Sequence, residues 1–437
     1  MARRIFAAAL AAADARQAVM RSLLPRGQRL AIGPEGREID LSKFRRIWVV
    51  GAGKAAAHMA SACEDRLGSS VTGGAVVVKY GHAVPLTRVR VFEAGHPVPD
   101  EAGVAAAREV CRLLEGAGRH ELIIALISGG GSALLTLPAD GVSLADKQRL
   151  TEQLLACGAS IDEVNCVRKH VSATKGGQLA RVAAPARVEA LVVSDVVGDS
   201  LATIASGPFA PDPTTFGEAL AVLARHGLEG SAPEAIVRRL RRGAEGGLPE
   251  TPKAGEALFR RVRHHLVATN RLALEAAAAE ARRLGFNTLV LSSVVQGEAR
   301  EAGRVWAALL KEEVVRGSPL ERPACLLAGG ETTVTLRGRG KGGRNTELAL
   351  AAAIDLAGVK RVALLSGATD GTDGPTDAAG AVVDGTTCRR AGHLGLDARG
   401  SLATNDSYTF FARLRRGLLI TGPTLTNVMD LHVMLAG

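Results

Sequence analysis

The sequence predicts an α/β protein built on a mostly parallel, doubly wound sheet. Short apolar runs typical of buried strands alternate along the chain with alanine-rich stretches typical of helices. Such alternation marks βαβ units, in which helices cover both faces of a parallel sheet. The 437 residues allow two or three domains, and 47% hydrophobic content indicates a globular core rather than a disordered chain.

The first half of the chain supplies most of the predicted parallel strands. A helix is expected over residues 3–22, ended by Pro25. Further strands are expected at Arg45–Val50, Ala75–Lys79, Val89–Phe92, Leu122–Ile127 and Val188–Val193. Further helices are expected at about 55–67, 102–114, 144–157, 167–182, 217–226 and 232–242.

A segment rich in Gly, Pro and Glu, Gly243–Gly255, is the best linker candidate. Beyond it we expect strands at Leu266–Thr269, Asn287–Ser292, Cys325–Ala328, Arg361–Leu365, Leu418–Thr421 and Val428–Met434. Helices are expected from Arg271, from Glu298, over Thr346–Leu356 and over 405–413.

Composition narrows the class of function. The net charge of +10 is compatible with nucleic acid, but aromatic residues make up only 3% of the chain, so an anionic small substrate is favoured. The N-terminus briefly resembles a signal peptide, yet Asp14 and Arg16 interrupt its apolar part and an amphipathic helix fits better. With six scattered cysteines, no CxxC pair and no apolar run of membrane-spanning length, we expect a cytoplasmic protein with free thiols.

Glycine-rich loops follow two of the predicted strands in the first half. Gly51-Ala-Gly-Lys-Ala-Ala resembles a dinucleotide fingerprint, but no acidic residue ends the next strand, and no Walker A motif exists anywhere. We interpret this loop as an anion site that includes Lys54; the alternative is tight strand–helix packing. Ser128-Gly-Gly-Gly-Ser132 offers consecutive amides that suit a carboxylate or phosphate, the alternative being a strained turn.

Basic residues gather on the predicted helix that follows. Arg168, Lys169, His170 and Lys175 fall within one or two helical turns, where they form either an anion site or a solvated basic face. In the second half, Arg337, Arg339, Lys341 and Arg344 lie among glycines just before a predicted helix, a setting that suits an anionic ligand.

Carboxylates follow two other predicted strands. Asp195 and Asp199 follow one, and Asp370, Asp373 and Asp377 follow the other. Their spacing does not match an EF-hand, so Mg²⁺ bound with phosphate oxygens fits better than a calcium cage. The alternative is that they are caps and turns.

Together these motifs resemble the class II glycerate kinases, the glycerate 2-kinase family, over nearly the whole chain. The resemblance is carried, in order, by Val50-Gly-Ala-Gly-Lys-Ala, Gly95-His-Pro-Val-Pro-Asp, Ile127-Ser-Gly-Gly-Gly-Ser-Ala-Leu, Asn165-Cys-Val-Arg-Lys-His, Ser194-Asp-Val-Val-Gly-Asp, Ala205-Ser-Gly-Pro, Gly329-Gly-Glu-Thr-Thr-Val, Gly342-Gly-Arg-Asn-Thr-Glu and Gly367-Ala-Thr-Asp-Gly-Thr-Asp-Gly-Pro. It implies a Rossmann-like N-terminal domain (1–242), a smaller C-terminal α/β domain with a mixed sheet (256–437), and an active site in the cleft between them. It also implies ATP- and Mg²⁺-dependent phosphorylation of D-glycerate to 2-phosphoglycerate, with catalytic roles for Lys54 and Arg344.

From the motifs and the resemblance we assign expected roles to residues. The nucleotide is expected at Gly51, Gly53, Ser128, Gly129, Gly130, Gly131, Ser132, Gly329, Glu331, Lys341, Asn345 and Thr369. Mg²⁺ is expected at Asp195, Asp199, Asp370 and Asp373, and D-glycerate at Arg168, Lys169 and Lys175. Arg168 and the amides of Ser128–Ser132 are the candidates for its carboxylate.

Two other functions remain open at this stage. One is an NAD(P)H-dependent hydroxypyruvate reductase, a label that members of the family also carry. The other is a small-anion or nucleic-acid binding protein without turnover. For the kinase we expect no nucleic-acid or membrane partner and a monomer or homodimer.

Overall fold

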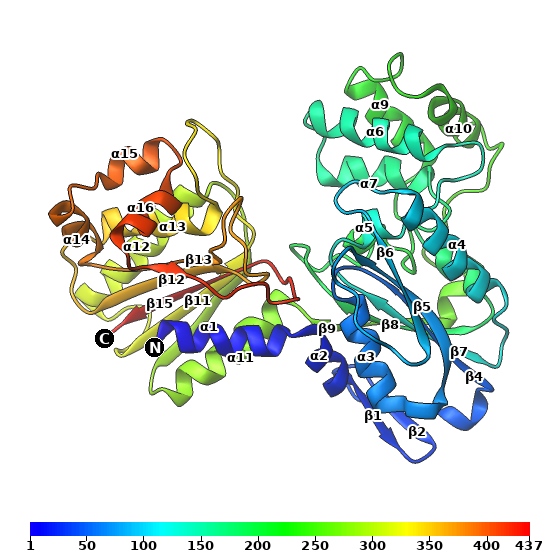
Figure 1. Ribbon diagram of the computed structural model, residues 1–437, viewed down its shortest axis with the longest axis horizontal. Coiled ribbons are helices and arrows are strands. Elements are labelled where there is room, and N and C mark those ends of the chain that lie inside the picture. Colours follow the sequence, from blue (N-terminus) through cyan, green and yellow to red (C-terminus); the bar gives the residue numbers. More distant parts are fainter. The chain divides into compact units, whose positions relative to one another are not determined.

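The computed structural model describes residues 1–437 and divides them into two compact units (Figure 1). The parallel unit comprises Ala15–Ser194 and Asp199–Val267. The mixed unit comprises Met1–Asp14, Asp195–Gly198 and Ala268–Gly437. None of the helices is long and apolar enough to cross a lipid bilayer.

The first helix differs from its prediction. The helix expected over residues 3–22 is two helices, α1 (Ala2–Ala13) and α2 (Ala15–Ser22), because Asp14 adopts an extended backbone with ψ of 117°. Helix α1 packs on α11 (Asn270–Arg283) of the mixed unit, whereas α2 packs on α3 (Ala56–Leu67) of the parallel unit. The predicted division at 1–242 and 256–437 therefore differs at the N-terminus, at Asp195–Gly198 and at 256–267.

The parallel unit contains a six-stranded sheet in the order β6-β5-β4-β7-β8-β9. Its strands are β4 (Arg46–Ala52), β5 (Val71–Lys79), β6 (Val89–Ala94), β7 (Glu121–Ile127), β8 (Arg187–Val193) and β9 (Val262–Ala268). This is the doubly wound order expected of a Rossmann-like sheet, in which the chain reverses its direction of progress between β4 and β7. Strand β7 is buried along its whole length, as its apolar run predicts.

Helices and a small hairpin sheet complete the parallel unit. The helices are α2, α3, α4 (Glu101–Glu115), α5 (Gly131–Leu134), α6 (Leu144–Ala156), α7 (Ile161–His170), α8 (Gln178–Ala183), α9 (Phe216–Arg225) and α10 (Glu234–Ala244). Helices α6, α7, α9 and α10 share one apolar core that includes Leu150, Val164 and Phe216, and they lie together in Figure 1. A three-stranded antiparallel sheet, β1 (Leu23–Arg26), β2 (Arg29–Ile32) and β3 (Arg37–Asp40), was not predicted.

The helix predicted over 167–182 is also wrong. Helix α7 begins at Ile161, where Ser160 and Glu163 form a reciprocal capping box, and the chain turns before the short helix α8. The Ser-x-x-Glu signature was present in the sequence, and it is a known start signal for a helix.

The mixed unit has a second six-stranded sheet in the order β10-β11-β15-β12-β13-β14. Its strands are β10 (Asn287–Val295), β11 (Ala324–Gly330), β12 (Val362–Ala368), β13 (Gly380–Asp384), β14 (Leu418–Leu419) and β15 (Asp430–Ala436). Only β10 and β11 pair in parallel, and the other pairs are antiparallel. The mixed sheet expected for the second domain is therefore confirmed.

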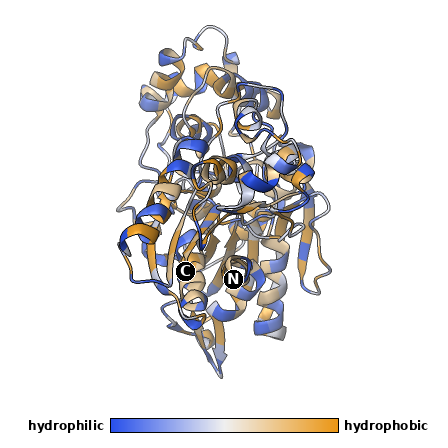
Figure 2. Ribbon diagram, turned by 90° about the vertical axis from the view of Figure 1, so that its left-hand side faces the viewer, coloured by the Kyte–Doolittle hydropathy of each residue, from blue (hydrophilic) through white to orange (hydrophobic).

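Helices cover the mixed sheet. They are α1, α11, α12 (Ala299–Arg316), α13 (Arg344–Asp355), α14 (Thr387–His393), α15 (Ala398–Ala403) and α16 (Ser407–Leu414). The alanine-rich helices α1, α11 and α13 pack directly on its strands. Helix α13 lies in the core with Leu348, Leu350 and Ala352 fully buried. In Figure 2 the strands are mostly in hydrophobic colours and the connecting loops mostly in hydrophilic ones.

Candidate active site

In the parallel unit, the two glycine-rich loops lie side by side at the carboxyl ends of β4 and β7. The amide of Lys54 donates to the carbonyl of Gly129 (2.8 Å), and the hydroxyl of Ser128 accepts from the amide of Ala55 (3.1 Å). A Cβ on Gly53 would lie 2.1 Å from the Ser128 hydroxyl, so the close approach requires glycine. The loops therefore meet where the sheet order reverses, the usual ligand position in such sheets.

Cationic and imidazole side chains surround this junction. Gly130, in the left-handed region at φ 85°, leaves room for His96 and for the stem of Lys54. Burial, together with the charges of Lys54, Lys79 and His82, lowers the pKa of His96 to about 4. A neutral His96 beside Lys54 is suited to hydrogen bonding, while the local positive potential favours an anion.

A hydroxyl–amide chain extends from the second loop. The Ser132 hydroxyl lies 2.8 Å from that of Ser206, which donates to Asn165 Oδ1 at 3.0 Å. Ala205, Ser206 and Gly207 all have positive φ, between 52° and 62°. Strained backbone of this kind is concentrated at functional sites.

Three basic side chains lie close together in this unit without a carboxylate partner: Lys147 and Lys175 are buried, and Arg168 is partly buried. Burial and the charge of Arg168 lower the pKa of Lys147 to about 7, and its Nζ has no hydrogen-bond partner. Burial, Lys147 and Arg168 lower the pKa of Lys175, whose Nζ donates only to the carbonyl of Leu135 (3.1 Å). Uncompensated buried cations are costly, and a bound anion would relieve that cost.

Lys169 points elsewhere. Its Nζ is 3.1 Å from Asp212 Oδ1, in a buried pair whose other oxygen accepts from Thr251. Burial opposes ionisation of Asp212, but the charge of Lys169 and the hydrogen bonds from Thr214 together outweigh it, and the pKa of the carboxyl is lowered. Lys169 therefore has a structural partner, unlike Arg168 and Lys175.

In the mixed unit, Arg344 is the first residue of α13 and is held by two acids. Its Nε and Nη2 donate to the two oxygens of Asp430 (2.5 and 3.0 Å), and its Nη1 lies 3.1 Å from Glu331. Burial lowers the pKa of Arg344, but the charge and hydrogen bonds of Asp430 together with the charge of Glu331 outweigh it, and the net shift is upward. The guanidinium is thus fixed at a helix start and remains partly exposed.

Asp430 was not among the predicted site residues. It begins β15, which runs antiparallel between β11 and β12, so its partners in register are Gly330 and Ala368 at the carboxyl ends of those strands. The side chain also accepts from Asn345 Nδ2 at 2.9 Å. Asn345, which was expected at the nucleotide, thus donates to the same carboxylate that holds Arg344.

Asp373, expected as a metal ligand, caps α13 instead. Its oxygens accept from the amides of Asn345 and Thr346 (both 2.8 Å) and from the Thr346 hydroxyl (2.8 Å). Burial raises the pKa of Asp373 despite these bonds. The carboxylate is therefore occupied by the helix start.

The charges of three other acids affect the pKa of Glu331, which lies beside Arg344. Burial raises the pKa of Glu331, and the charges of Asp430, Asp195 and Asp370 add to the shift, while Arg344 opposes it. Asp370 and Asp195 are partly exposed, and the former accepts from the amide of Thr372. Asp199 lies in the parallel unit, and no group of three or more His, Cys, Asp or Glu in the chain has the geometry to hold a metal by itself.

Of the other residues expected to bind the nucleotide, two make packing contacts within the fold and one is exposed on the surface. A Cβ on Gly329 would lie 2.1 Å from Asn270, and the Thr369 hydroxyl donates to the carbonyl of Met429 (2.7 Å), so both residues are structural in their contacts. Lys341 is exposed, with its Nζ 4.6 Å from the ring centre of Tyr408.

Two candidate functional residues, Lys147 and Asp430, were not predicted, although the sequence pattern around Lys147 pointed to a buried position. Lys147 recurs with Leu144, Leu150 and Leu154 at helical spacing, which places it on the buried face of α6, where a lysine is rare. Asp430 had no such signal, because its position depends on the pairing of β15 with two distant strands.

Comparisons with known proteins cover the whole chain. A family model described as a domain of unknown function, DUF4147, matches residues 1–241, and one described as the MOFRL family matches residues 324–430. The D-glycerate 2-kinase of Thermotoga maritima is 46% identical over 389 residues, 89% of this chain and 90% of that protein. A protein of Agrobacterium vitis named as a hydroxypyruvate reductase is 45% identical over 437 residues, 100% of this chain and 94% of that protein. The crystal structure of a glycerate kinase from Thermotoga maritima superposes with a TM-score of 0.89 at 42% identity, covering 100% of this chain and 98% of that one.

Proposed function

This chain belongs to the glycerate 2-kinase family, and we propose that it transfers the terminal phosphoryl group of ATP to the C2 hydroxyl of D-glycerate, giving 2-phosphoglycerate and ADP. The observation that carries the proposal is the fixed guanidinium of Arg344, held by Asp430 at the start of α13 and flanked by Glu331. Phosphoryl transfer needs positioned positive charge more than covalent chemistry, and a preorganised arginine supplies it.

Lys54 is the second proposed catalytic cation. It follows the glycine turn at the end of β4, and its backbone is tied to the neighbouring loop through Gly129. Its stem lies against Gly130, whose own loop presents backbone amides suited to phosphate oxygens. We assign Lys54 and Arg344 to neutralising charge on the transferring group, each on the evidence of its own unit.

The buried cations of the parallel unit are proposed to bind the carboxylate of D-glycerate. Arg168 and Lys175 were expected to bind the substrate, and Lys147 joins them because the two lysines are buried, Arg168 is partly buried, and none of the three has an acidic partner. Lys169 is left out, since Asp212 already pairs with it. The hydroxyls of Ser132 and Ser206 lie on neighbouring segments and are suited to hydrogen bonding with a hydroxy acid.

Mg²⁺ fits one part of the expected carboxylate set. Asp195 and Asp370 both act on Glu331, and magnesium is typically held by one or two carboxylates together with phosphate oxygens. A bound ion there would neutralise charge on the nucleotide phosphates. We leave out Asp373, which caps α13, and Asp199, which lies in the parallel unit.

A reductase is disfavoured by the charges beside the loops of the parallel unit. In dinucleotide-binding sheets an acid near the end of the second strand holds the ribose hydroxyls of NAD. Here that strand, β5, ends at Lys79, whose charge acts on His96 together with Lys54 and His82. The surroundings are those of a site for phosphate or carboxylate groups.

A product assay tests the proposed reaction. Purified protein with ATP, Mg²⁺ and D-glycerate is expected to form 2-phosphoglycerate and ADP in equal amounts, separated chromatographically from 3-phosphoglycerate. K54M is expected to lower turnover by about 100-fold or more, whereas K311M, at an exposed lysine of α12, leaves it unchanged. Oxidation of NADH with hydroxypyruvate in the absence of ATP, or formation of 3-phosphoglycerate alone, would contradict the proposal.

A further inference from the structure

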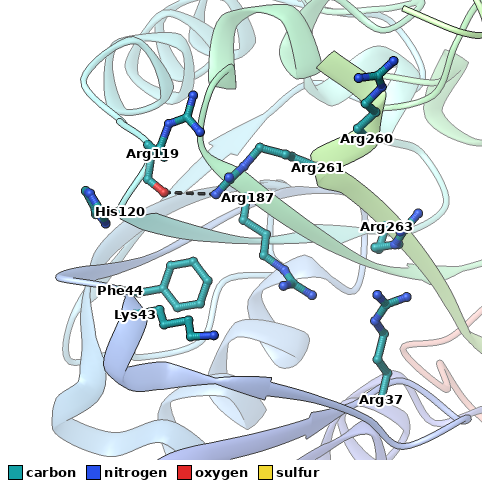
Figure 3. Close-up of a pocket in the computed structure, with 9 residues that line it drawn as sticks. All are labelled: Arg37, Lys43, Phe44, Arg119, His120, Arg187, Arg260, Arg261 and Arg263. Carbon is teal, nitrogen blue, oxygen red and sulfur yellow. Dashed lines mark hydrogen bonds between the residues drawn. The ribbon is translucent and has the colours of Figure 1, made fainter. Parts of the chain in front are cut away.

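A strongly cationic cavity of about 500 Å³ lies in the parallel unit, away from the glycine-rich loops (Figure 3). Its lining is basic except for one aromatic ring: Arg37, Lys43, Phe44, Arg119, His120, Arg187, Arg260, Arg261 and Arg263. Figure 3 shows Lys43 and Phe44 on one side and Arg260 and Arg263 on the other, with Arg187 between them. No acid lines the cavity, so six arginines and a lysine face one space.

Strand direction explains why these residues gather. Phe44 precedes β4, Arg119 and His120 precede β7, Arg187 begins β8, and Arg261 precedes β9. Strands β4, β7 and β8 pair in parallel, so their amino ends share one edge of the sheet. The glycine-rich loops follow the carboxyl ends of β4 and β7, seven residues and roughly 20 Å further along the strands. The cavity is therefore separate from the proposed catalytic loops.

The acids closest in sequence to the cavity are already paired with other groups. Glu121 accepts from Arg46 (2.7 Å), and Glu38 accepts from Arg29 (2.8 Å), neither of which lines the cavity. Glu189 accepts from Arg187 and from His265 (2.6 and 2.7 Å). Of the lining cations, only Arg187 and Lys43 have acidic partners, the latter at 4.0 Å in an exposed pair.

Arg261 has a buried hydrogen-bond donor that no acceptor in the cavity satisfies. Its Nη2 donates to the carbonyl of Arg119 (3.0 Å), but its Nε is buried and makes no hydrogen bond. Burial and the positive charges of Arg119 and Arg187 lower the pKa of Arg261. Like charges held together in this way destabilise a folded protein unless an anion joins them.

We propose that this cavity is a second anion site, which binds a polyphosphate group, either free or as the phosphate chain of a nucleotide. Arginine is suited to this ligand, because its planar fork donates two hydrogen bonds to a phosphate. Several arginines around a cavity of small-ligand size match an ion with more than one phosphate. Nucleic acid fits less well, because its binding surfaces stack successive bases on several aromatic rings and only Phe44 and His120 are present.

Isothermal titration with inorganic triphosphate in phosphate-free buffer tests the site in the full chain. R260Q/R263Q removes two exposed lining charges that have no ion-pair partner, and R241Q/R242Q is the matched control on the exposed end of α10. The lining variant is expected to weaken triphosphate binding by about tenfold or more, while the control retains wild-type affinity. Binding elsewhere in the chain is common to both variants and cancels in the comparison.

The same titrations with an adenosine nucleotide of equal phosphate number identify the source of the ligand. If the affinity of the lining variant falls further below that of the control for the nucleotide than for triphosphate, the site is assigned to nucleotides. If the affinity falls equally for both ligands, the site is assigned to the polyphosphate alone. Both variants are expected to keep basal turnover, and the unfolding temperature of the lining variant should not fall below that of the wild type, since its change relieves repulsion between like charges. Three results would overturn the proposal. These are equal weakening of triphosphate binding in both variants, no triphosphate binding at low salt, or, in a parallel titration with single-stranded DNA, a loss of affinity in the lining variant for the DNA alone.

Discussion

At the scale of the residue, identical side chains take different roles according to what surrounds them. Lys169 and Lys175 are both buried, yet the first pairs with Asp212 and the second has only a backbone carbonyl. Lys147 has no partner at all. A buried lysine with an acidic partner stabilises the fold, whereas buried lysines without one are suited to binding an anion.

The pH dependence of stability tests the state of Lys147. Its pKa is about 7 in the folded chain but near 10.5 when unfolded, so between these values the unfolded state binds more protons. The stability of the wild type is therefore expected to rise with pH in this range, by about 1.4 kcal/mol per unit from this group. Chemical denaturation of K147M between pH 7 and 10 should show that contribution missing.

The matched control is K311M, which removes an exposed lysine of α12. Its curve of unfolding free energy against pH should run parallel to that of the wild type. If the curve of K147M also runs parallel to that of the wild type, burial does not lower the pKa of Lys147, and the proposed role of the buried lysines fails.

Arg344 allows a test that keeps its charge. R344K still offers a cation to buried Asp430 but loses the bidentate geometry. Turnover with ATP and D-glycerate should fall about 100-fold, since a preorganised donor is lost. R413K, at an exposed position of the same unit, should leave turnover unchanged. A fall of less than about threefold in R344K would remove Arg344 from the proposed mechanism.

At the scale of the element, the start of α13 organises the mixed unit's part of the site. Gly343 stands at the cap position, Asp373 accepts from the first helical amides, and Arg344 projects from the same turn. The negative cap stabilises the positive end of the helix. The direction of Arg344 therefore depends on a carboxylate that does not touch it.

Two aspartate variants separate capping from metal binding. D373N weakens the cap of α13, so the free energy of unfolding should fall by about 1–2 kcal/mol while the Mg²⁺ dependence of turnover stays unchanged. D370N, at a partly exposed carboxylate near Glu331, should show the reverse pattern. Thermal unfolding and a Mg²⁺ titration of turnover measure both effects. A shifted Mg²⁺ requirement in D373N would return Asp373 to the metal set.

At the scale of the whole molecule, the two ends of the chain are joined in one unit. Helix α1 lies against α11 and beside β12 and β15 of the mixed sheet, near the C-terminus (Figure 1). Phe6 is 2% exposed, and a Cβ on Gly367 of β12 would lie 2.9 Å from its ring. The first helix therefore fills a space that glycine leaves in a strand over 300 residues away.

Hydrogen exchange of F6A tests this assignment. Replacing a buried phenylalanine typically costs about 3–5 kcal/mol, and here the loss should loosen the mixed unit. Amides of β12 and β15 should exchange faster, and those of β4 and β7 should be unaffected. F92A, at a half-buried phenylalanine of β6, is the reciprocal control and should affect only the parallel unit. Faster exchange in β4 and β7 of F6A would contradict the division.

The sequence by itself determined the local features: where most of the strands lie, and that glycine-rich loops follow β4 and β7. These depend on residue spacing and backbone sterics, which act over a few residues. Only the tertiary structure decided that α1 joins the C-terminal unit, that Asp430 holds Arg344 while Asp373 caps α13, and that Lys147 joins Arg168 and Lys175. It also gathered the arginines at the amino ends of the strands. Each of these depends on strand order and on burial between distant segments, and no local pattern encodes those.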